Sequence, residues 1–383
     1  ILEQCGLTTW IAQWCGSRKV CVGRPWILTA FFFLACFLVG GCINLYGGVM
    51  VLWSIFYAVA KTAGFKKGDT YVTYMVSGIV FISTISIISM PFLPLAIIYN
   101  GLLKDAATGF SAPIIAQTIT GLAIVFFSIL GYLFVGKFIL KADVTPFTKN
   151  ADMLAQYRNI KMDKEQKICI ALLAVFVFII LTPKVVSIEP LKALLNNIGI
   201  IGAALFAVIV QCLRRDAEGK SIYSFKKLAS SGLNWDLIIL FAATMPISAA
   251  MESSDTGIIA TLVSMLMPIF QSLSPVAFML VCMAIFWAAT QLAHNLILVI
   301  VFMPTLASIG VSMGINPYLF CLLFCMTTNC AFMTPGASAQ AAMIFGNTDW
   351  ISTKDAYKYC TIFAVVALLA ITCIGLPLGL LLF

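Results

Sequence analysis

Apolar stretches long enough to cross a lipid bilayer recur along most of this chain of 383 residues. A membrane-spanning helix needs about 20 apolar residues, and residues 113–140, 191–212 and 357–383 each reach that length. Only 10% of all residues are charged, whereas soluble domains carry about a quarter. Because lipid offers no partner to backbone polar groups, the chain is predicted to be an all-α polytopic membrane protein.

Two apolar runs, 26–60 and 275–310, are too long for a single crossing at about 1.5 Å per residue. The first is interrupted by GGCINLYGG at 40–48, and the second by His294 and Asn295. Non-helical backbone at membrane depth is tolerated where it lines a cavity or is buried in protein. Each run is therefore predicted to be a re-entrant helical hairpin that returns to the side from which it entered.

Two further apolar runs, 71–103 and 316–346, contain proline near the middle, at Pro91 and Pro94 in the first and at Pro335 in the second. Proline lacks a backbone N–H and breaks a helix. Both runs are therefore predicted to be interrupted helices.

The distribution of basic residues supports this arrangement. If both hairpins return to the side they entered, 20 of the 23 lysines and arginines fall on one side of the membrane, and Lys104, Lys184 and Lys192 are the exceptions. The positive-inside rule makes that side cytoplasmic. The net charge of +8 therefore reflects membrane topology, and no nucleic-acid partner is expected.

The two halves of the chain show weak internal similarity. Asn44 follows Glu3 by 41 residues, Asn295 follows Glu252 by 43, and an interrupted helix comes after each hairpin. The hairpins open to opposite sides, which is typical of an inverted-topology repeat. The predicted parts are a first repeat (1–140), connecting loops with two scaffold spans (141–235) and a second repeat (236–383). The first repeat is predicted to start with an interfacial helix at 1–15, the scaffold spans are predicted at 168–183 and 191–212, and the second repeat is predicted to start with a span at 236–250.

Inverted repeats place binding sites near the membrane midplane, where broken helix ends expose N–H groups that suit an anion. The predicted substrate ligands are Asn44, His294, Asn295 and Ser338. The predicted ion ligands are Asn44, Asn295, Ser89 and Thr334.

A structural alternative stands beside each of these predictions. A buried histidine or asparagine can simply close a hairpin tip by bonding backbone, and a serine in a membrane helix often bonds its own i−4 carbonyl. His294, the only histidine, titrates near physiological pH and is therefore also a candidate for proton coupling.

No enzyme signature is present in the sequence. One histidine cannot supply an HExxH motif, and the chain has neither a phosphate-binding loop nor paired cysteines at zinc spacing. The cysteines inside apolar runs are expected to be free thiols. No catalytic residue, metal site or cofactor is predicted, apart from sodium as a coupling ion.

The stretches NWDLIILFAATMPISAAMESS, ATQLAHNLILV and NCAFMTPGASAQAAMIFG resemble the divalent anion:sodium symporter family, which carries dicarboxylates, citrate and sulfate. The resemblance covers about 235–383 well and 1–140 more loosely. It implies an elevator-type homodimer in which a scaffold domain holds a moving transport domain.

The family's hairpin tips carry Ser-Asn-Thr, and the matching positions here are Ile43-Asn44-Leu45 and His294-Asn295-Leu296. The family's interrupted helices carry a Thr-Pro-Pro-Asn-like stretch, matched here by Leu93–Ala96 and Ser338–Ala341. Both tip asparagines are kept and several hydroxyls are lost. Sodium prefers oxygen ligands, so backbone carbonyls or proton coupling would have to compensate.

The expected function is secondary active transport of small anions, with di- or tricarboxylates foremost, in a bacterial cytoplasmic membrane. The expected partners are the anion, sodium or a proton, the lipid bilayer and a second copy of the chain. Two alternatives are a non-transporting relative that binds an anion or a partner, and a carrier of sulfate or another inorganic anion. The family usually has about three more helices before the position of Ile1, so the chain is expected to be incomplete.

Overall fold

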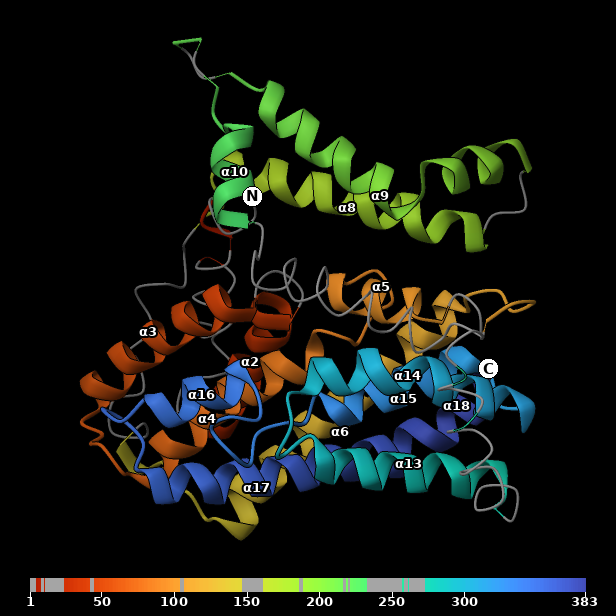
Figure 1. Cartoon of the computed structure of the whole chain (residues 1–383). Helices are drawn as coiled ribbons and strands as arrows, with labels where there is room; N and C mark the ends of the chain where they lie inside the picture. Colours follow the sequence, from red (N-terminus) through yellow and green to blue (C-terminus); the bar gives the residue numbers. More distant parts are fainter. Residues whose placement is uncertain are drawn as a thin grey trace. The chain divides into compact units, whose positions relative to one another are not determined.

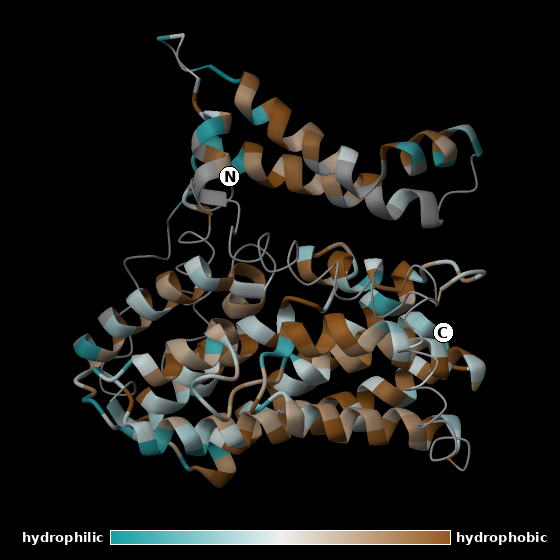
Figure 2. Cartoon of the chain, viewed as in Figure 1, coloured by the Kyte–Doolittle hydropathy of each residue, from teal (hydrophilic) through white to brown (hydrophobic). Residues whose placement is uncertain are grey.

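A computed structural model of the chain describes residues 5–7, 10, 24–41, 45–103, 107–146, 161–185, 189–215, 218–219, 221–232, 257, 261 and 273–383. In these ranges the regular structure is helical, and the only extended pairing is an isolated bridge between Arg215 and Ser221. Figure 2 shows that most of these helices are rich in apolar residues, with hydrophilic residues concentrated toward helix ends and connections. The predicted all-α architecture is confirmed.

Three of the described helices are long and apolar enough to cross a membrane: Ile114–Ile139, Asn295–Ser312 and Thr353–Leu382. Two of them correspond to the predicted spans 113–140 and 357–383. The predicted span at 236–250 and most of the predicted interfacial helix at 1–15 lie outside the described residues.

The chain folds as two compact units, which are described separately. The first unit comprises Ile1–Trp10 with Ile160–Ala243, and the second comprises Ile11–Asn159 with Thr244–Phe383.

In both halves of the second unit a helix pair is followed by an interrupted helix and then a long helix (Figure 1). Each long helix continues into a π-helical segment, whereas a π-helical segment in the helix pair and a short helix at the end each occur in one half only. The first half contains α2 (Pro25–Ala35), η2 (Cys36–Gly41), α3 (Leu45–Ala63), α4 (Thr70–Ser86), α5 (Pro94–Gly101), α6 (Ile114–Phe134) and η3 (Val135–Ile139). The second half contains α13 (Pro275–Ala289), α14 (Asn295–Ser312), α15 (Pro317–Thr328), α16 (Ala339–Gly346), α17 (Thr353–Ala370), η5 (Ile371–Gly375) and α18 (Leu376–Leu382).

The first helix pair is an antiparallel hairpin. The rings of Phe32 and Phe56 meet edge-to-face at 6.2 Å. Gly48 lies against the backbone of Gly40, so closely that a Cβ on Gly48 would be 2.9 Å from the Gly40 Cα. The contact residue that comes earlier before the connection, Phe32, meets the one that comes later after it, Phe56. This is the order expected where two successive helices run antiparallel.

The second helix pair has the same geometry. The Phe286 and Phe302 rings meet at 5.1 Å, and Gly310 faces the Phe278 ring, with 3.6 Å between an added Cβ and Cε1. In each contact the two residues lie equally far from His294 along the chain, on opposite sides of it. The helices α13 and α14 therefore form a helical hairpin with His294 at its tip. Whether either hairpin is re-entrant in a membrane stays a prediction.

Each half of the second unit also contains an interrupted helix. The break between α4 and α5 covers 87–93, and the break between α15 and α16 covers 329–338. The packing of the halves is reciprocal, because α5 packs against α15 while α16 packs against α4. An inverted repeat would make reciprocal contacts of this kind, and the inverted repeat itself stays a prediction.

An aromatic core holds the second unit together around α4, whose residues from Tyr71 to Ser86 are all buried. The Phe81 ring stacks on Phe363 at 4.5 Å and meets Phe332 edge-on at 4.9 Å. These rings join α4, α17 and the second break. Aromatic pairs of this geometry stabilise a core beyond the burial of their area.

A second aromatic contact joins the first hairpin to the second half. Tyr57 of α3 stacks on Trp350 with ring centroids 4.6 Å apart and an interplanar angle of 1°. Asn347 Nδ2 donates to the Tyr57 hydroxyl at 2.5 Å. The hairpin is thereby tied to the loop between α16 and α17.

The first unit contains α8 (Lys164–Val185) and α9 (Glu189–Leu213), which lie side by side, and the short helix α10 (Phe225–Gly232) (Figure 1). The predicted scaffold spans at 168–183 and 191–212 fall within α8 and α9, so their helical character is confirmed.

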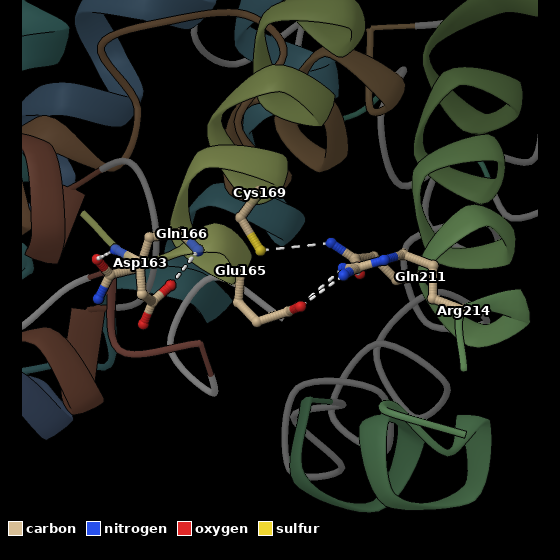
Figure 3. A network of polar contacts seen from close by, with 6 residues as sticks. All are labelled: Asp163, Glu165, Gln166, Cys169, Gln211 and Arg214. Atoms are coloured by element: carbon tan, nitrogen blue, oxygen red, sulfur yellow. Dashed lines mark hydrogen bonds and ion pairs between the residues drawn. The ribbon is translucent and has the colours of Figure 1, made fainter. Parts of the chain in front are cut away.

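A polar network joins the ends of α8 and α9 (Figure 3). The Arg214 guanidinium donates to both carboxylate oxygens of Glu165, at 2.7 Å and 2.5 Å. These bonds raise the pKa of Arg214 above its ordinary value, because they favour the charged guanidinium. Gln211 donates to the Cys169 sulfur at 3.3 Å. Charged groups with such partners fix where the two helices meet.

Asp163 and Gln166 form a capping box at the start of α8. The Gln166 N–H donates to Asp163 Oδ1 at 2.7 Å, and the Asp163 N–H donates to Gln166 Oε1 at 3.1 Å. Reciprocal bonds of this kind satisfy backbone donors that a helix leaves free at its N-terminus.

Candidate functional site

The connection between α13 and α14 is hydrogen-bonded to the break between α15 and α16. Gln291 is the centre of this contact. Its Nε2 donates to the Cys330 carbonyl at 2.9 Å, and its Oε1 accepts the N–H groups of Phe332 and Met333 at 3.2 Å and 2.9 Å. The hairpin tip and the break therefore form one hydrogen-bonded unit, named here the tip–break cluster (residues 290–295 and 328–338).

Two threonines extend the cluster on either side of Gln291. The Thr290 hydroxyl donates to the Thr328 carbonyl at 2.7 Å, at the end of α15. The Thr334 hydroxyl donates to the Gln291 carbonyl at 2.6 Å. Thr334, a predicted ion ligand, therefore bridges the break and the hairpin.

Asn295 connects the cluster to the first half through Asn329. Asn295 Nδ2 donates to Asn329 Oδ1 at 2.9 Å, and Asn329 Nδ2 donates to the Thr84 carbonyl at 3.0 Å. Asn295 is 6% exposed and Asn329 is 3% exposed. A chain of two buried amides thus joins the start of α14 to the ends of α15 and α4.

Ser338, a predicted substrate ligand, closes the break and begins α16. Its hydroxyl donates to the Ala331 carbonyl at 2.6 Å and accepts the Ala341 N–H at 3.1 Å. The second bond is an N-cap, which satisfies a donor that the helix leaves free. Ser338 therefore fixes both the width of the break and the first turn of α16.

His294 is the N-cap residue of α14. Its Nδ1 accepts the Leu296 N–H at 3.3 Å, and Asn295 Oδ1 accepts the same N–H at 2.9 Å. The side chain is half-buried, next to the 84% exposed Leu292. His294 thus lies at the more accessible edge of the cluster.

The predicted residues of the first half lie apart from this cluster. Asn44 lies outside the described residues. Ser89 is fully buried in the first break, where its hydroxyl donates to the Ser86 carbonyl at 2.7 Å. Gly121 of α6 leaves room for the Ser89 backbone, since a Cβ there would lie 2.8 Å from the Ser89 carbonyl carbon.

The structure thus brings four of the predicted residues together, His294, Asn295, Thr334 and Ser338. Gln291 and Asn329 also belong to the cluster and were not predicted from the sequence as site residues. Polar side chains at membrane depth are expensive and tend to mark functional positions, and that signal was available for both amides within their apolar runs.

The cluster can offer attraction to both signs of charge. The N-termini of α14 and α16 begin in it, and helix N-termini carry a partial positive charge that suits an anion. The C-terminus of α15 ends in it, and its carbonyls suit a cation. Within the described part of the chain, no group of three or more His, Cys, Asp and Glu side chains is placed to hold a metal ion.

Comparison with known protein families shows the family to which the chain belongs. Residues 161–383 match the sodium:sulfate symporter transmembrane region. The chain belongs to this family. The resemblance drawn from the hairpin and interrupted-helix stretches is therefore confirmed, and the family is one of membrane symporters and not of enzymes.

Individual relatives of this symporter-family chain match shorter segments. The uncharacterized transporter YfbS of Escherichia coli (strain K12) is 28% identical over 173 residues, which is 45% of this chain and 27% of the relative. The sodium-dependent dicarboxylate transporter SdcS of Staphylococcus saprophyticus is 26% identical over 122 residues, which is 32% of this chain and 23% of the relative. The matches thus span about a quarter of each relative's length. Together with its apolar helices, family membership makes the chain a multi-pass membrane protein.

Proposed function

We propose that the protein is a secondary active transporter of small dianions, with dicarboxylates as the preferred class. One observation carries the proposal. In a chain of the symporter family, the N-termini of α14 and α16 and the C-termini of α4, α13 and α15 meet where the second hairpin contacts the second interrupted helix. A relative, SdcS, is named as a sodium-dependent dicarboxylate transporter.

The proposed substrate ligands are Asn44, His294, Asn295 and Ser338. The proposed ion ligands are Asn44, Asn295, Ser89 and Thr334. The positive ends of α14 and α16 support anion binding at the second tip. The C-terminal carbonyls of α15 support a cation beside it, so sodium is the proposed coupling ion and a proton at His294 is the alternative.

The proposed mechanism is alternating access by an elevator-like movement in a homodimer located in a bacterial cytoplasmic membrane. The proposed domains are those of the sequence analysis, with inverted repeats at 1–140 and 236–383 around connecting spans at 141–235. The repeated order of elements and their reciprocal packing support the repeats. The bacterial relatives support the location.

Sulfate transport is the second candidate, because the matching family is described by sodium:sulfate symport. Sulfate and a dicarboxylate are both dianions, so the same helix N-termini would serve either. The two substrates differ in size and in the separation of their charges, which an uptake assay resolves directly.

The experiment is uptake of labelled succinate, citrate and sulfate into proteoliposomes, each with an inward sodium gradient, an inward proton gradient or neither. The expected result is saturable succinate uptake that the sodium gradient stimulates. Preference for sulfate would replace the dicarboxylate proposal. Uptake no faster than in protein-free liposomes, for all three anions under all three conditions, would overturn the transport proposal.

A further inference from the structure

The Gln291 side chain makes more hydrogen bonds to the second break than the side chain of any ligand predicted from the sequence. We infer that Gln291 is a positioning residue that fixes the backbone of the break and thereby places Thr334 and Ser338. The local claim stands on the geometry alone, while its consequence for transport rests on the proposed function.

The contacts require an amide. Gln291 Nε2 donates to two carbonyls, those of Trp287 and Cys330, both at 2.9 Å. Oε1 accepts two N–H groups, those of Phe332 and Met333. Glutamate has no donor when ionised, and methionine has neither a strong donor nor a strong acceptor. Of these three similarly sized side chains, only glutamine satisfies all four groups.

Because these groups are buried, losing one of the hydrogen bonds is costly. Gln291 is 6% exposed, and Cys330 and Phe332 are each 1% exposed. A buried backbone group that loses its partner bears the full cost of its desolvation. Removing the amide therefore leaves the N–H groups of the break without this partner, and the backbone must move to find another.

The Gln291 side chain bonds the stretch of the break that comes just before Thr334 and Ser338. They reach Cys330, Phe332 and Met333, which precede Thr334, and the main-chain carbonyl of Gln291 accepts the Thr334 hydroxyl. Ser338 in turn bonds Ala331, inside the segment that Gln291 holds. A shift of this segment therefore displaces both hydroxyls, although neither bonds the Gln291 side chain.

The first half is built differently. Its hairpin meets α4 through glycines, since Gly40 lies against Ser83 and Gly41 against Ser86 with no room for a Cβ. Neither the described part of that hairpin nor the break at 87–93 contains asparagine or glutamine. In the ranges that the structure describes, an amide clamp between hairpin and break is thus a feature of the second half.

The first test does not depend on transport and uses a native thiol as reporter. Cys330 lies in the break at 1% exposure, and Cys360 of α17 is fully buried. Purified protein is treated with N-ethylmaleimide, and labelling of each cysteine is followed by mass spectrometry. In Gln291→Met, the labelling rate of Cys330 is expected to rise at least tenfold, while that of Cys360 stays unchanged.

Gln117→Met is the matched control. Gln117 is a buried glutamine, 2% exposed, and it pairs with Asn100 of α5 at 3.1 Å, away from the second break. Its loss removes a buried amide of the same size, so it is expected to leave Cys330 labelling at the wild-type rate. Gln291→Glu, which keeps the shape but loses the donors, is expected to behave like Gln291→Met.

The second test measures uptake by the same variants. Gln291→Met and Gln291→Glu are expected to raise the sodium concentration for half-maximal uptake and the substrate KM at least fivefold. Gln117→Met is expected to leave both values within twofold of wild type. A purely structural role would lower only the amount of folded transporter and hence the maximal rate, with both concentrations unchanged.

Cys330 labelling at the wild-type rate in Gln291→Met and Gln291→Glu would overturn the inference. So would a fall in maximal rate with both half-saturating concentrations unchanged. If the wild-type protein transports nothing, the proposed function fails while the labelling result still decides the role of Gln291.

Discussion

Tyr74 and Tyr132 exchange hydrogen bonds through their hydroxyl groups. The Tyr74 hydroxyl donates to the Tyr132 carbonyl at 3.0 Å, and the Tyr132 hydroxyl donates to the Tyr74 carbonyl at 3.1 Å. The rings stack with centroids 4.5 Å apart. Gly136 makes this possible, since a Cβ there would lie 2.5 Å from the Tyr74 ring. The pair joins α4 to the end of α6.

Tyr132→Phe is expected to lower the stability of the second unit by about 1 kcal/mol, the typical net contribution of one hydrogen bond. Tyr74→Phe should cost a similar amount, and the double variant should cost less than the sum, because the bonds support one another. Thermal unfolding in detergent measures these costs. Tyr357→Phe, on an exposed part of α17, is the control. Midpoints equal to wild type in both single variants would contradict the pairing.

Gly121→Ala is expected to destabilise the protein by about 1–3 kcal/mol, because overpacking forces the surrounding backbone to move. The added Cβ would meet the backbone of Ser89 in the first break. Gly101→Ala is the matched control, since nothing lies within 4 Å of a Cβ at that position. Thermal midpoints of the two variants make the comparison. Equal midpoints would show that the backbone of the first break can move away from the added methyl group without loss of stability.

Asn295→Ala is expected to abolish uptake, since it removes a proposed ligand and the amide chain to Asn329 and Thr84. Asn100→Ala, which loses a paired amide on α5, is the control and should retain uptake. Initial rates in proteoliposomes, corrected for the amount of reconstituted protein, test this. A wild-type rate for Asn295→Ala would remove this asparagine from the site.

His294→Asn is expected to flatten the dependence of uptake on pH between about pH 5 and 8, the range in which histidine titrates. In the structure Nδ1 accepts the Leu296 N–H. Protonation of His294 turns that acceptor into a donor and weakens the cap. Asparagine keeps a capping oxygen without titrating. An unchanged pH profile in the variant would count against any role of His294 in proton coupling.

Much of the fold was predictable because its signals are local. Proline within an apolar run breaks a helix wherever it occurs, so Pro94 and Pro335 indicated the two interrupted helices. A run too long for one crossing, with His294 and Asn295 at its centre, indicated the second hairpin. These inferences require no knowledge of distant partners.

The tip–break cluster was only partly predictable because its bonds join distant segments through the backbone. Ser338 was chosen as a hydroxyl beside a helix break, but its bond to the Ala331 carbonyl depends on the path of the loop. Gln291 has four backbone partners, three of them about 40 residues further along the chain, and every residue type supplies such partners. Side-chain identity alone therefore could not reveal the contact.

The reciprocal packing of the two interrupted helices makes the halves of the second unit obligate partners. Each short helix after a break packs on the helix that precedes the break in the opposite half, α5 on α15 and α16 on α4. If either half were expressed by itself, the short helix after its break would have no helix of the other half to pack against. Two fragments divided between α6 and α13 would recover their native form only when they are produced together.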